Sequence, residues 1–287
     1  MKSGFVSLIG RPNVGKSTLI NAIVGKKISI ISPKSQTTRD AIQGIYNDDD
    51  SQIVFVDTPG IHKPKTVLDK EMDKIAFYNA RTNDLTVLLI DASRKFSDGD
   101  NYILRSLNKE VPLIVAFNKI DESNVILINE LKEKYKELLP DSPIIEMSAL
   151  EEFNIDELIK TIKTYLVEGP QYYDVKTITN KDFKFYVEET IREVALKLLK
   201  EEVPHSIAVI CDEHFEGKNI FAKIIVEKDS QKGIIIGKRG QMIKKIGIRA
   251  RKQIEEYLGY TINLELVVQV EKDWKNSNKF LSKIGYK

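Results

Sequence analysis

The residue types that could do chemistry begin near the N-terminus, where positions 10–17 read GRPNVGKS. Glycines let backbone N–H groups curl around phosphate oxygens without a Cβ in the way. A helix that begins near Lys16 points the positive end of its dipole at a bound anion. The Lys16 amine can reach the outer phosphates, and the Ser17 hydroxyl can bind Mg²⁺. The spacing G-x-x-x-x-G-K-[ST] predicts a phosphate-binding loop. Its expected contacts are Gly10, Arg11, Pro12, Asn13, Val14, Gly15, Lys16 and Ser17.

A second pattern, DTPG at 57–60, directly follows an apolar run at 53–56. The Asp57 carboxylate can hold Mg²⁺ through a water molecule, and Gly60 can offer its backbone N–H to the terminal phosphate. The same four residues also mark ordinary turns. Their place after a phosphate loop favours the nucleotide reading. The expected contacts are Asp57, Thr58, Pro59, Gly60 and Ile61.

The third pattern, NKID at 118–121, indicates which base is bound. The Asp121 carboxylate can accept hydrogen bonds from the N1–H and the exocyclic amino group of guanine. Adenine lacks this pair of donors and would leave the carboxylate unpaired, a mismatch that discriminates by ~10⁴. Asn118 can tie this loop to the phosphate loop, and the stem of Lys119 can lie over the base. The expected contacts are Asn118, Lys119, Ile120 and Asp121.

A fourth element, SAL at 148–150, follows the apolar run that ends at position 147. It can present a backbone N–H to the O6 atom of guanine, which makes Ser148 and Ala149 expected contacts. Three such residues carry little weight alone. Their position after the other three patterns gives them that role.

The elements that must position these residues alternate in the first part of the chain. Short β-branched runs alternate with helical patterns, which predicts βαβ units around a mostly parallel sheet. The acidic turn at 47–51 predicts that its two flanking strands form a hairpin, so the sheet should be mixed. We expect strands at 5–10, 41–46, 53–56, 85–91, 113–118 and 144–147. We expect helices at 16–24, 68–80, 101–107, 125–138 and 155–166.

A domain boundary is predicted after residue 168, because Gly169-Pro170 ends the preceding helix. The expected division is a nucleotide-binding domain at 1–168, a linker at 169–183 and a second domain at 184–287. The second domain should contain a helix at 185–201, strands at 206–211 and 220–227, a glycine-rich turn, a basic helix to about 257, and a strand at 261–270. The fold class is therefore α/β followed by a smaller α+β domain.

The glycine-rich turn of the second domain carries the sequence GKRG at 237–240. Such a turn lets a nucleic-acid backbone approach closely, while apolar neighbours form a groove for single-stranded bases. Residues 220–287 hold 15 Lys and Arg against 7 Asp and Glu, a net charge of +8, whereas the remainder has −6. A polyanion partner is expected for this domain. The expected RNA contacts are Gly237, Lys238, Arg239, Gly240, Lys244 and Lys245.

The four nucleotide patterns resemble those of the translation-factor-related P-loop GTPases. IIGKRG within an α-β-β-turn-α-β order is similar to a KH domain of type II. A P-loop GTPase domain followed by a KH domain resembles the Era family over nearly the whole chain, including the connector EEVPHS at 201–206. The resemblance implies a monomeric GTPase that uses Mg²⁺ and cycles between GTP and GDP. It also implies binding to small-subunit ribosomal RNA near its 3′ end, a role in assembly of the small ribosomal subunit, and peripheral contact with the inner membrane face.

The resemblance further implies roles in hydrolysis. In the family, a threonine before the second strand closes on Mg²⁺, and Thr38 is the expected ligand, with the adjacent Thr37 left open as the alternative. The asparagine of the phosphate loop, here Asn13, is implied to help hold K⁺ and so to make hydrolysis K⁺-stimulated. The expected catalytic set is Lys16, Thr38, Gly60 and Asn13.

Ras-like enzymes position the attacking water with a glutamine after the DxxG pattern. This chain has Ile61 there, and an aliphatic side chain cannot orient water. His62 could be a base, although a histidine exposed on a switch loop is the favoured reading. Arg39 is expected to anchor its loop rather than act as an arginine finger.

The single cysteine, Cys211, rules out an internal disulfide and favours a reducing compartment. With no signal sequence or long apolar stretch, we expect a cytoplasmic protein that can touch the inner face of the membrane. Two alternatives remain. A membrane-associated signalling GTPase would use the basic domain on lipid or protein, but no lipidation motif supports it. A P-loop kinase would have no need of the guanine carboxylate.

Overall fold

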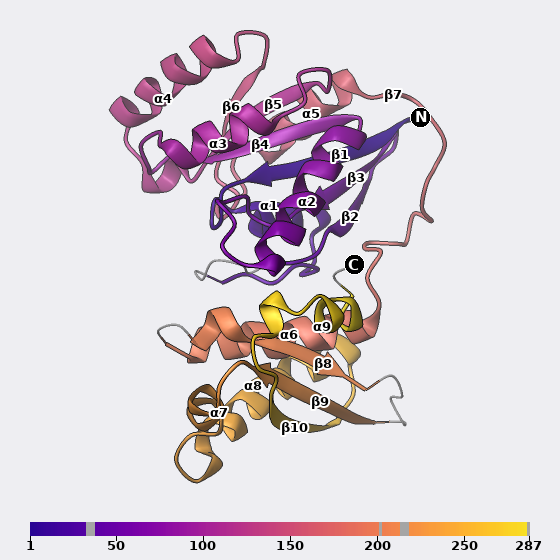
Figure 1. Ribbon diagram of the computed structural model, residues 1–287. Helices are drawn as coiled ribbons and strands as arrows, with labels where there is room; N and C mark the ends of the chain where they lie inside the picture. The colour runs from indigo at the N-terminus through magenta and orange to yellow at the C-terminus, as the bar shows by residue number, and fades with distance from the viewer. Residues whose placement is uncertain (33–37, 201–202, 213–217, 286–287) are drawn as a thin grey trace. The chain divides into compact units, whose positions relative to one another are not determined.

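The computed structural model describes residues 1–32, 38–200, 203–212 and 218–285. The chain divides into two compact units (Figure 1). Nearly all of residues 1–180 belong to the first, and residues 181–287 belong to the second. In the described parts of the chain, no helix has the length and apolar character to cross a bilayer.

The first unit is built on a mixed sheet of seven strands in the order β2-β3-β1-β4-β5-β6, with β7 paired to β1. The β1, β3, β4, β5 and β6 strands run parallel, and the predicted hairpin is confirmed by the antiparallel β2–β3 pair. The strands are β1 (Lys2–Gly10), β2 (Ile42–Asn47), β3 (Ser51–Asp57), β4 (Leu85–Asp91), β5 (Leu113–Asn118), β6 (Ile144–Glu146) and β7 (Val167–Glu168).

Five helices cover the two faces of this sheet. They are α1 (Lys16–Val24), α2 (Val67–Thr82), α3 (Asp98–Ser106), α4 (Val125–Leu138) and α5 (Ile155–Tyr165). Apolar residues of α1 and α5 pack with one set of strand residues, and those of α2, α3 and α4 pack with the alternate set. Because successive strand side chains point to opposite faces, both faces of the sheet are buried.

The four nucleotide patterns meet because of this topology. Parallel strands place their carboxyl ends at the same edge of a sheet, and ligands bind at that edge. The phosphate loop leaves β1, Asp57 ends β3, and Asn118 ends β5. The SAL segment directly follows β6 and its flanking residue Met147. The four patterns therefore lie at one edge of the sheet.

The segment that leads out of the first unit is tied to the edge of this sheet. The Gln52 carboxamide accepts hydrogen bonds from the backbone N–H groups of Tyr172 and Tyr173 and donates to the carbonyl of Tyr173. Further along, the Ile45 N–H donates to the Ile178 carbonyl at 3.0 Å. The predicted linker therefore follows β2 and β3 as an ordered segment. Its sequence has no clear period and gave no sign of this order.

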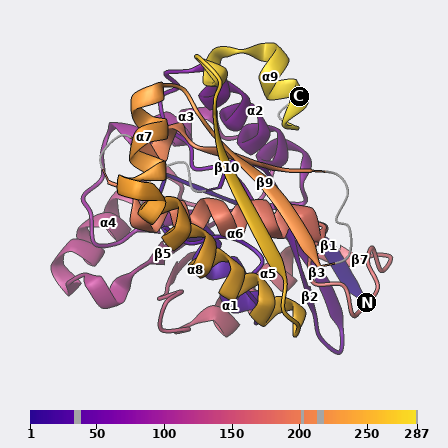
Figure 2. The same cartoon turned by 90° about the horizontal axis from the view of Figure 1, so that it is seen from below.

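The second unit is a three-stranded sheet in the order β10-β9-β8. The strands are β8 (Ala208–Cys211), β9 (Asn219–Val226) and β10 (Asn263–Val270); β10 is parallel to β9 and β8 is antiparallel to it. The helices are α6 (Phe183–Leu198), α7 (Asp229–Ile236), α8 (Gln241–Leu258) and α9 (Asn278–Lys283). Figure 2 shows α6 and α8 crossing this sheet. Their apolar residues form one core with the strands.

Two helices in the described part of the second unit, α7 and α9, were not predicted. The sequence indicated only a glycine-rich turn between β9 and the basic helix, whereas Asp229–Ile236 form α7. The Gln231 side chain accepts hydrogen bonds from the N–H groups of Glu227 and Lys228, which caps the helix start. Ile235 anchors the helix in the core. A short helix tolerates Gly233 here because burial of Ile235 compensates the low helix propensity of glycine.

Candidate guanine-nucleotide site and basic surface

The phosphate loop has the backbone conformation that its glycines permit. Gly10 and Gly15 have φ values of 155° and 103°, and Asn13 lies in the left-handed region at 65°. A Cβ on Gly10 would meet the Leu89 carbonyl oxygen at 2.5 Å. Helix α1 begins at Lys16 with Gly15 as its N-cap. The helix therefore presents its first N–H groups to the loop, which suits an anion.

Lys16 is held inside this loop. Its amine donates to the carbonyl oxygens of Gly10 and Arg11 at 3.3 and 3.2 Å, and the residue is 6% exposed. Burial lowers the Lys16 pKa to about 8, and the opposite charge of Asp57 offsets part of this effect. Negatively charged phosphate oxygens in the loop would stabilise the buried Lys16 cation. The position of Lys16 therefore suits a phosphate ligand.

Oxygen atoms converge on Asp57 at the end of β3. Its Oδ2 accepts hydrogen bonds from Ser17 at 2.8 Å, Ser29 at 2.9 Å and Thr38 at 3.4 Å. The Ser17 and Thr38 hydroxyls are 2.9 Å apart. Burial raises the Asp57 pKa, although the charge of Lys16 and the three hydroxyl groups oppose this. Its Oδ1 is buried without a hydrogen-bond partner in the described part of the chain.

This oxygen cluster fits Mg²⁺, because hydroxyl and carboxylate oxygens are the donors that the ion prefers. The orphaned Oδ1 of Asp57 can receive a metal-bound water. The expected ligands Ser17 and Thr38 lie together in it. The alternative ligand, Thr37, lies outside the described residues. Sequence reasoning missed Ser29, because no motif marks its position.

The segment after Asp57 packs directly on the phosphate loop. A Cβ on Gly60 would meet the Cα of Pro12 at 2.8 Å, so only glycine fits this approach. The Ile61 N–H donates to the Gly10 carbonyl at 3.0 Å, and the Ile61 side chain is 1% exposed. Thr58 donates to the Leu8 carbonyl and fixes the turn. Ile61 is a core residue, which agrees with its inability to position water.

The base loop is joined to both of its neighbours through Asn118. Asn118 donates from Nδ2 to the Val14 carbonyl at 2.7 Å, and its Oδ1 accepts from the Ala149 N–H at 2.8 Å. Lys119 has a positive φ of 64° and pairs with Asp91 at 2.9 Å. Burial would raise the pKa of Asp91, but hydrogen bonds from Ser93 and Lys119 outweigh it and lower that pKa.

The remaining members of the base loop lie where a ligand could reach them. Asp121 is exposed in the short helix Ile120–Glu122, which leaves its carboxylate accessible to a base. The Ala149 N–H is directed to Asn118, so an additional bond to guanine O6 requires that hydrogen to be shared. Ser148 is buried and accepts from the Glu151 N–H at 3.1 Å, which makes its side chain a part of the loop structure.

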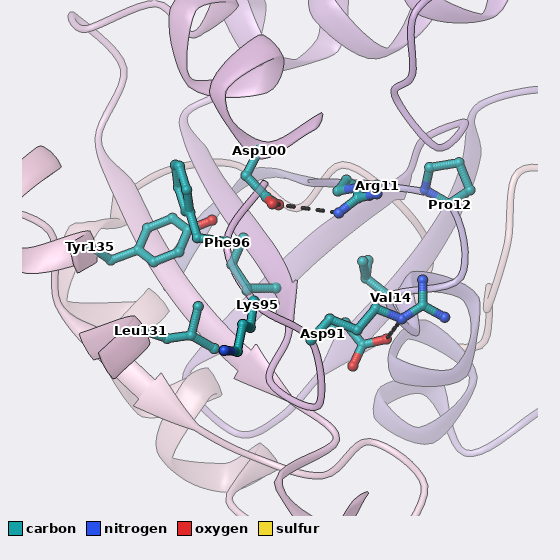
Figure 3. A pocket seen from close by; sticks show the side chains of 11 residues that line it. Arg11, Pro12, Val14, Asp91, Lys95, Phe96, Asp100, Leu131 and Tyr135 are labelled. Atoms are coloured by element: carbon teal, nitrogen blue, oxygen red, sulfur yellow. Dashed lines mark hydrogen bonds and ion pairs between the residues drawn. The ribbon is translucent and has the colours of Figure 1, made fainter. Parts of the chain in front are cut away.

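Arg11 joins the phosphate loop to the start of α3 (Figure 3). Its guanidinium donates to the Ser97 hydroxyl at 2.8 Å and lies 3.5 Å from Asp100. The Tyr135 hydroxyl is buried beside this pair without a hydrogen-bond partner among the described residues. Burial raises the Tyr135 pKa well above its usual value. Arg11 thus supports the loop from the side rather than from the phosphate cradle.

Three other residues considered for hydrolysis have distinct surroundings. Asn13 is exposed at the tip of the loop. Arg39 is 3% exposed, as suits a loop anchor. His62 is half-buried and contacts the Gly60 carbonyl and Asp69, so the reading of an exposed switch-loop histidine is wrong.

The second unit presents a basic surface around the GKRG turn. Gly237, Arg239 and Gly240 have φ values of 71°, 53° and 75°, which bend the chain sharply between α7 and α8. The four expected cations, Lys238, Arg239, Lys244 and Lys245, are exposed. They surround the turn and the start of α8, where close approach of a phosphate backbone meets no Cβ at Gly240.

These features define a P-loop GTPase that carries a KH domain. The family model described as 50S ribosome-binding GTPase matches residues 5–119, and that of the KH domain matches residues 202–275. The chain is 48% identical to the curated GTPase Era of Clostridium kluyveri over 292 residues, which covers 100% of both chains. It is also 48% identical to GTPase Era of Lacticaseibacillus paracasei, over 99% of this chain and 96% of that one.

Two solved structures resemble this chain over its full length. One is a variant of Aquifex aeolicus Era bound to GDP and AlF4⁻, with a TM-score of 0.95 and 40% identity over 100% of this chain and 99% of that one. The other is Era in complex with MgGDPNP and nucleotides 1506–1542 of 16S ribosomal RNA, with a TM-score of 0.96 and the same identity and coverage. The chain belongs to the Era family of GTPases. Its reaction is hydrolysis of GTP to GDP and phosphate.

Proposed function

We propose that this chain is a GTP-dependent switch that binds small-subunit ribosomal RNA near its 3′ end and assists small-subunit assembly. The observation that carries the proposal is the likeness, over the whole chain, to an Era structure that holds both MgGDPNP and 16S ribosomal RNA. The proposed division is a GTPase domain at 1–168, a linker at 169–183 and a KH domain at 184–287.

The nucleotide is proposed to bind at the carboxyl edge of the first sheet. Lys16 and the N–H groups of the phosphate loop bind the β- and γ-phosphates, and Gly60 donates its N–H to the γ-phosphate. Asp121 accepts from the N1–H and amino group of guanine. Asn118 holds the base loop against the phosphate loop, which its bond to the Val14 carbonyl supports. The proposed contacts in full are residues 10–17, 57–61, 118–121, 148 and 149.

Mg²⁺ is proposed to bind the hydroxyl oxygens of Ser17 and Thr38, with Asp57 reached through water. The ion would neutralise charge on the phosphates. Thr38 is proposed to bind the ion only while the γ-phosphate is present. Loss of the γ-phosphate on hydrolysis then releases Thr38 from the ion. The buried orphan oxygen of Asp57 supports this arrangement.

Hydrolysis is proposed to depend on K⁺ held with the help of Asn13. Ile61 is buried and cannot orient the attacking water, so hydrolysis needs help from another group. A second cation beside Lys16 would give that help by neutralising charge on the phosphates. The exposed, left-handed Asn13 suits such a role. Comparison of kcat in KCl and NaCl tests it: wild type should be faster in KCl, and Asn13→Ala should lose the difference. Equal rates of the wild type in both salts would reject the K⁺ proposal.

Ribosomal RNA is proposed to bind the GKRG turn and the start of α8 through Gly237, Lys238, Arg239, Gly240, Lys244 and Lys245. Phosphate contacts by lysine and arginine release counterions, so binding should weaken steeply with salt. The test is filter binding of a 3′-end fragment of 16S ribosomal RNA by the full chain, with GDP or a GTP analogue. Lys238→Glu with Arg239→Glu should lower the affinity at least tenfold.

The matched control is Lys74→Glu with Lys160→Glu, which makes the same charge change on exposed residues of the first unit. Their surface ion pairs contribute little to stability. The control should bind the fragment like the wild type. Equal affinities of wild type and the GKRG variant would reject this RNA surface, while GTP hydrolysis would remain measurable in both.

Contact with the inner membrane face stays a prediction. Liposome flotation after RNase treatment checks it, since lipid binding would survive removal of RNA.

A further inference from the structure

His62 links two parts of the GTPase domain. Its Nδ1 lies 3.2 Å from the carbonyl oxygen of Gly60, and its Nε2 lies 3.4 Å from Asp69 Oδ1. Asp69 stands in the first turn of α2 (Val67–Thr82). The histidine therefore spans from the segment after β3 to the start of the following helix.

Both neighbours of the ring are acceptors. A carbonyl oxygen can only accept, so Nδ1 must carry a proton for a hydrogen bond to form. The Asp69 carboxylate is likewise an acceptor, so its contact with Nε2 requires a proton on that nitrogen. Its second oxygen accepts from the Lys65 N–H at 2.9 Å. A neutral imidazole has one N–H and would leave one of these contacts unmade. The geometry calls for the doubly protonated ring.

The peptide between Gly60 and Ile61 is thereby fixed at both of its polar ends. Its N–H, on Ile61, donates to the Gly10 carbonyl of the phosphate loop at 3.0 Å. Its carbonyl, on Gly60, faces His62. This peptide directly follows the Gly60 N–H that is proposed to contact the γ-phosphate, and fixing it restrains the Gly60 backbone on its C-terminal side.

We propose that His62 is a positioning residue which, in its doubly protonated form, holds the Gly60–Ile61 peptide to Asp69 and so aligns Gly60 for GTP hydrolysis. The effect on hydrolysis rests on the proposed contact between Gly60 and the γ-phosphate. The form with two ring protons also rules out His62 as the general base, because it has no free lone pair.

Other charged groups around His62 agree with this form. Its contact with Asp69 raises the His62 pKa above the usual value, and the charge of Asp73 adds to this. Asp73 is buried in α2 and accepts a hydrogen bond from Tyr102 of α3 at 3.2 Å. Burial raises the Asp73 pKa to about 6, so this carboxyl is largely ionised near pH 7 and supports the cation. Above its raised pKa, His62 loses one proton and one of the two contacts.

The direct test is the protonation state of His62 in the full chain with GDP bound. The chain has three histidines, so ¹⁵N-histidine labelling with the His62→Gln variant identifies its signals. At pH 6.5 both ring nitrogens should show the shifts of imidazolium, with a midpoint above 6.5. Asp69→Asn should lower that midpoint, because it removes the largest cause of the raised pKa. A single neutral tautomer at pH 6.5, or a midpoint unmoved by Asp69→Asn, would overturn the proposal.

The second readout is kcat for GTP hydrolysis between pH 6 and pH 9. The ratio of wild type to Asp69→Asn should be greatest at low pH and approach one as His62 deprotonates, with little change in KM. Glu71→Gln, which removes a charge from the same helix, should leave the midpoint and the ratio unchanged. If the NMR result holds and the kcat ratio is flat, His62 is a structural tie and its proposed role in hydrolysis fails. Absence of GTP hydrolysis in the wild type would instead reject the activity.

Discussion

Asn118 and Val14 join the base loop to the phosphate loop through one buried hydrogen bond of 2.7 Å, from the Asn118 Nδ2 to the Val14 carbonyl. The other end of the same carboxamide accepts from the Ala149 N–H at 2.8 Å. A single side chain thus ties three loops that follow β1, β5 and β6. A rigid link of this kind holds base and phosphate contacts at a fixed separation, as a nucleotide requires.

Asn118→Ala should weaken GTP and GDP binding at least 100-fold and destabilise the GTPase domain. The substitution leaves the buried Ala149 N–H and Val14 carbonyl unpaired, and each such loss costs about 1–3 kcal/mol. Titration with a fluorescent guanine nucleotide and thermal unfolding of the nucleotide-free protein measure the two effects. Asn129→Ala, at an exposed position on α4, is the control and should match the wild type. Unchanged nucleotide affinity in Asn118→Ala would contradict the role of this link.

Gly15→Ala should abolish nucleotide binding. The new Cβ would lie 2.1 Å from the Asn118 Nδ2, and the backbone there has a φ of 103°. Gly25→Ala provides the matched control, because Gly25 also has a positive φ, of 70°, but open space around it. The control should lose only about 1 kcal/mol of stability and keep its affinity. Nucleotide affinity of Gly15→Ala as high as that of the Gly25→Ala control would contradict this steric account.

Helix boundaries were predictable where capping residues lie in the sequence. The predicted ranges of α1 and α4 match the structure, because Gly25 ends α1 and the Asn124 side chain caps α4 through the Leu127 N–H. The start of α3 was placed three residues late. Ser97 and Asp100 form a capping box there, and this local signal marks the true start of the helix.

The candidate site was predictable where its residues fall in short local patterns. Asn118 illustrates this, since its link to the phosphate loop was expected and is observed. Ser29 and Asp69 were not predicted. Ser29 contacts Asp57, 28 positions away, and Asp69 contacts His62 through the loop that leads into α2; no local period or spacing encodes either contact. The ordered linker beside Gln52 was missed for the same reason.

Glu188→Gln should stabilise the KH domain at pH 8 and flatten its stability between pH 5 and pH 8. Burial raises the Glu188 pKa to about 7, while its hydrogen bond from the Cys211 N–H and the charge of Lys184 act against this. The folded form therefore holds a proton that the unfolded form releases near pH 4.5. Wild-type stability should fall as pH rises through that window and level off above pH 7.

The glutamine keeps an acceptor for the Cys211 N–H without a charge to bury. The gain at pH 8 should be of the order of 1–2 kcal/mol, allowing for partial exposure of the group. Calorimetry of the full chain at several pH values measures it. Glu189→Gln, its neighbour paired with Arg192, is the control and should lower stability instead. A constant difference between Glu188→Gln and the wild type at every pH would sink this account.

Asp121→Asn should lower GTP affinity at least 100-fold and raise affinity for xanthosine triphosphate. Guanine offers two donors at N1 and its amino group, which a carboxylate accepts and a carboxamide can match only in part. Xanthine has a carbonyl in place of the amino group, so the asparagine can donate to that oxygen and accept from N1–H. Competition between the two triphosphates for the full chain measures the shift.

Glu122→Gln removes the neighbouring exposed charge in the same short helix and should keep the preference for GTP. Because Asp121 is exposed in this structure, the substitution should leave the unfolding temperature unchanged. Loss of GTP affinity without a gain for xanthosine triphosphate would place the guanine contact on another residue.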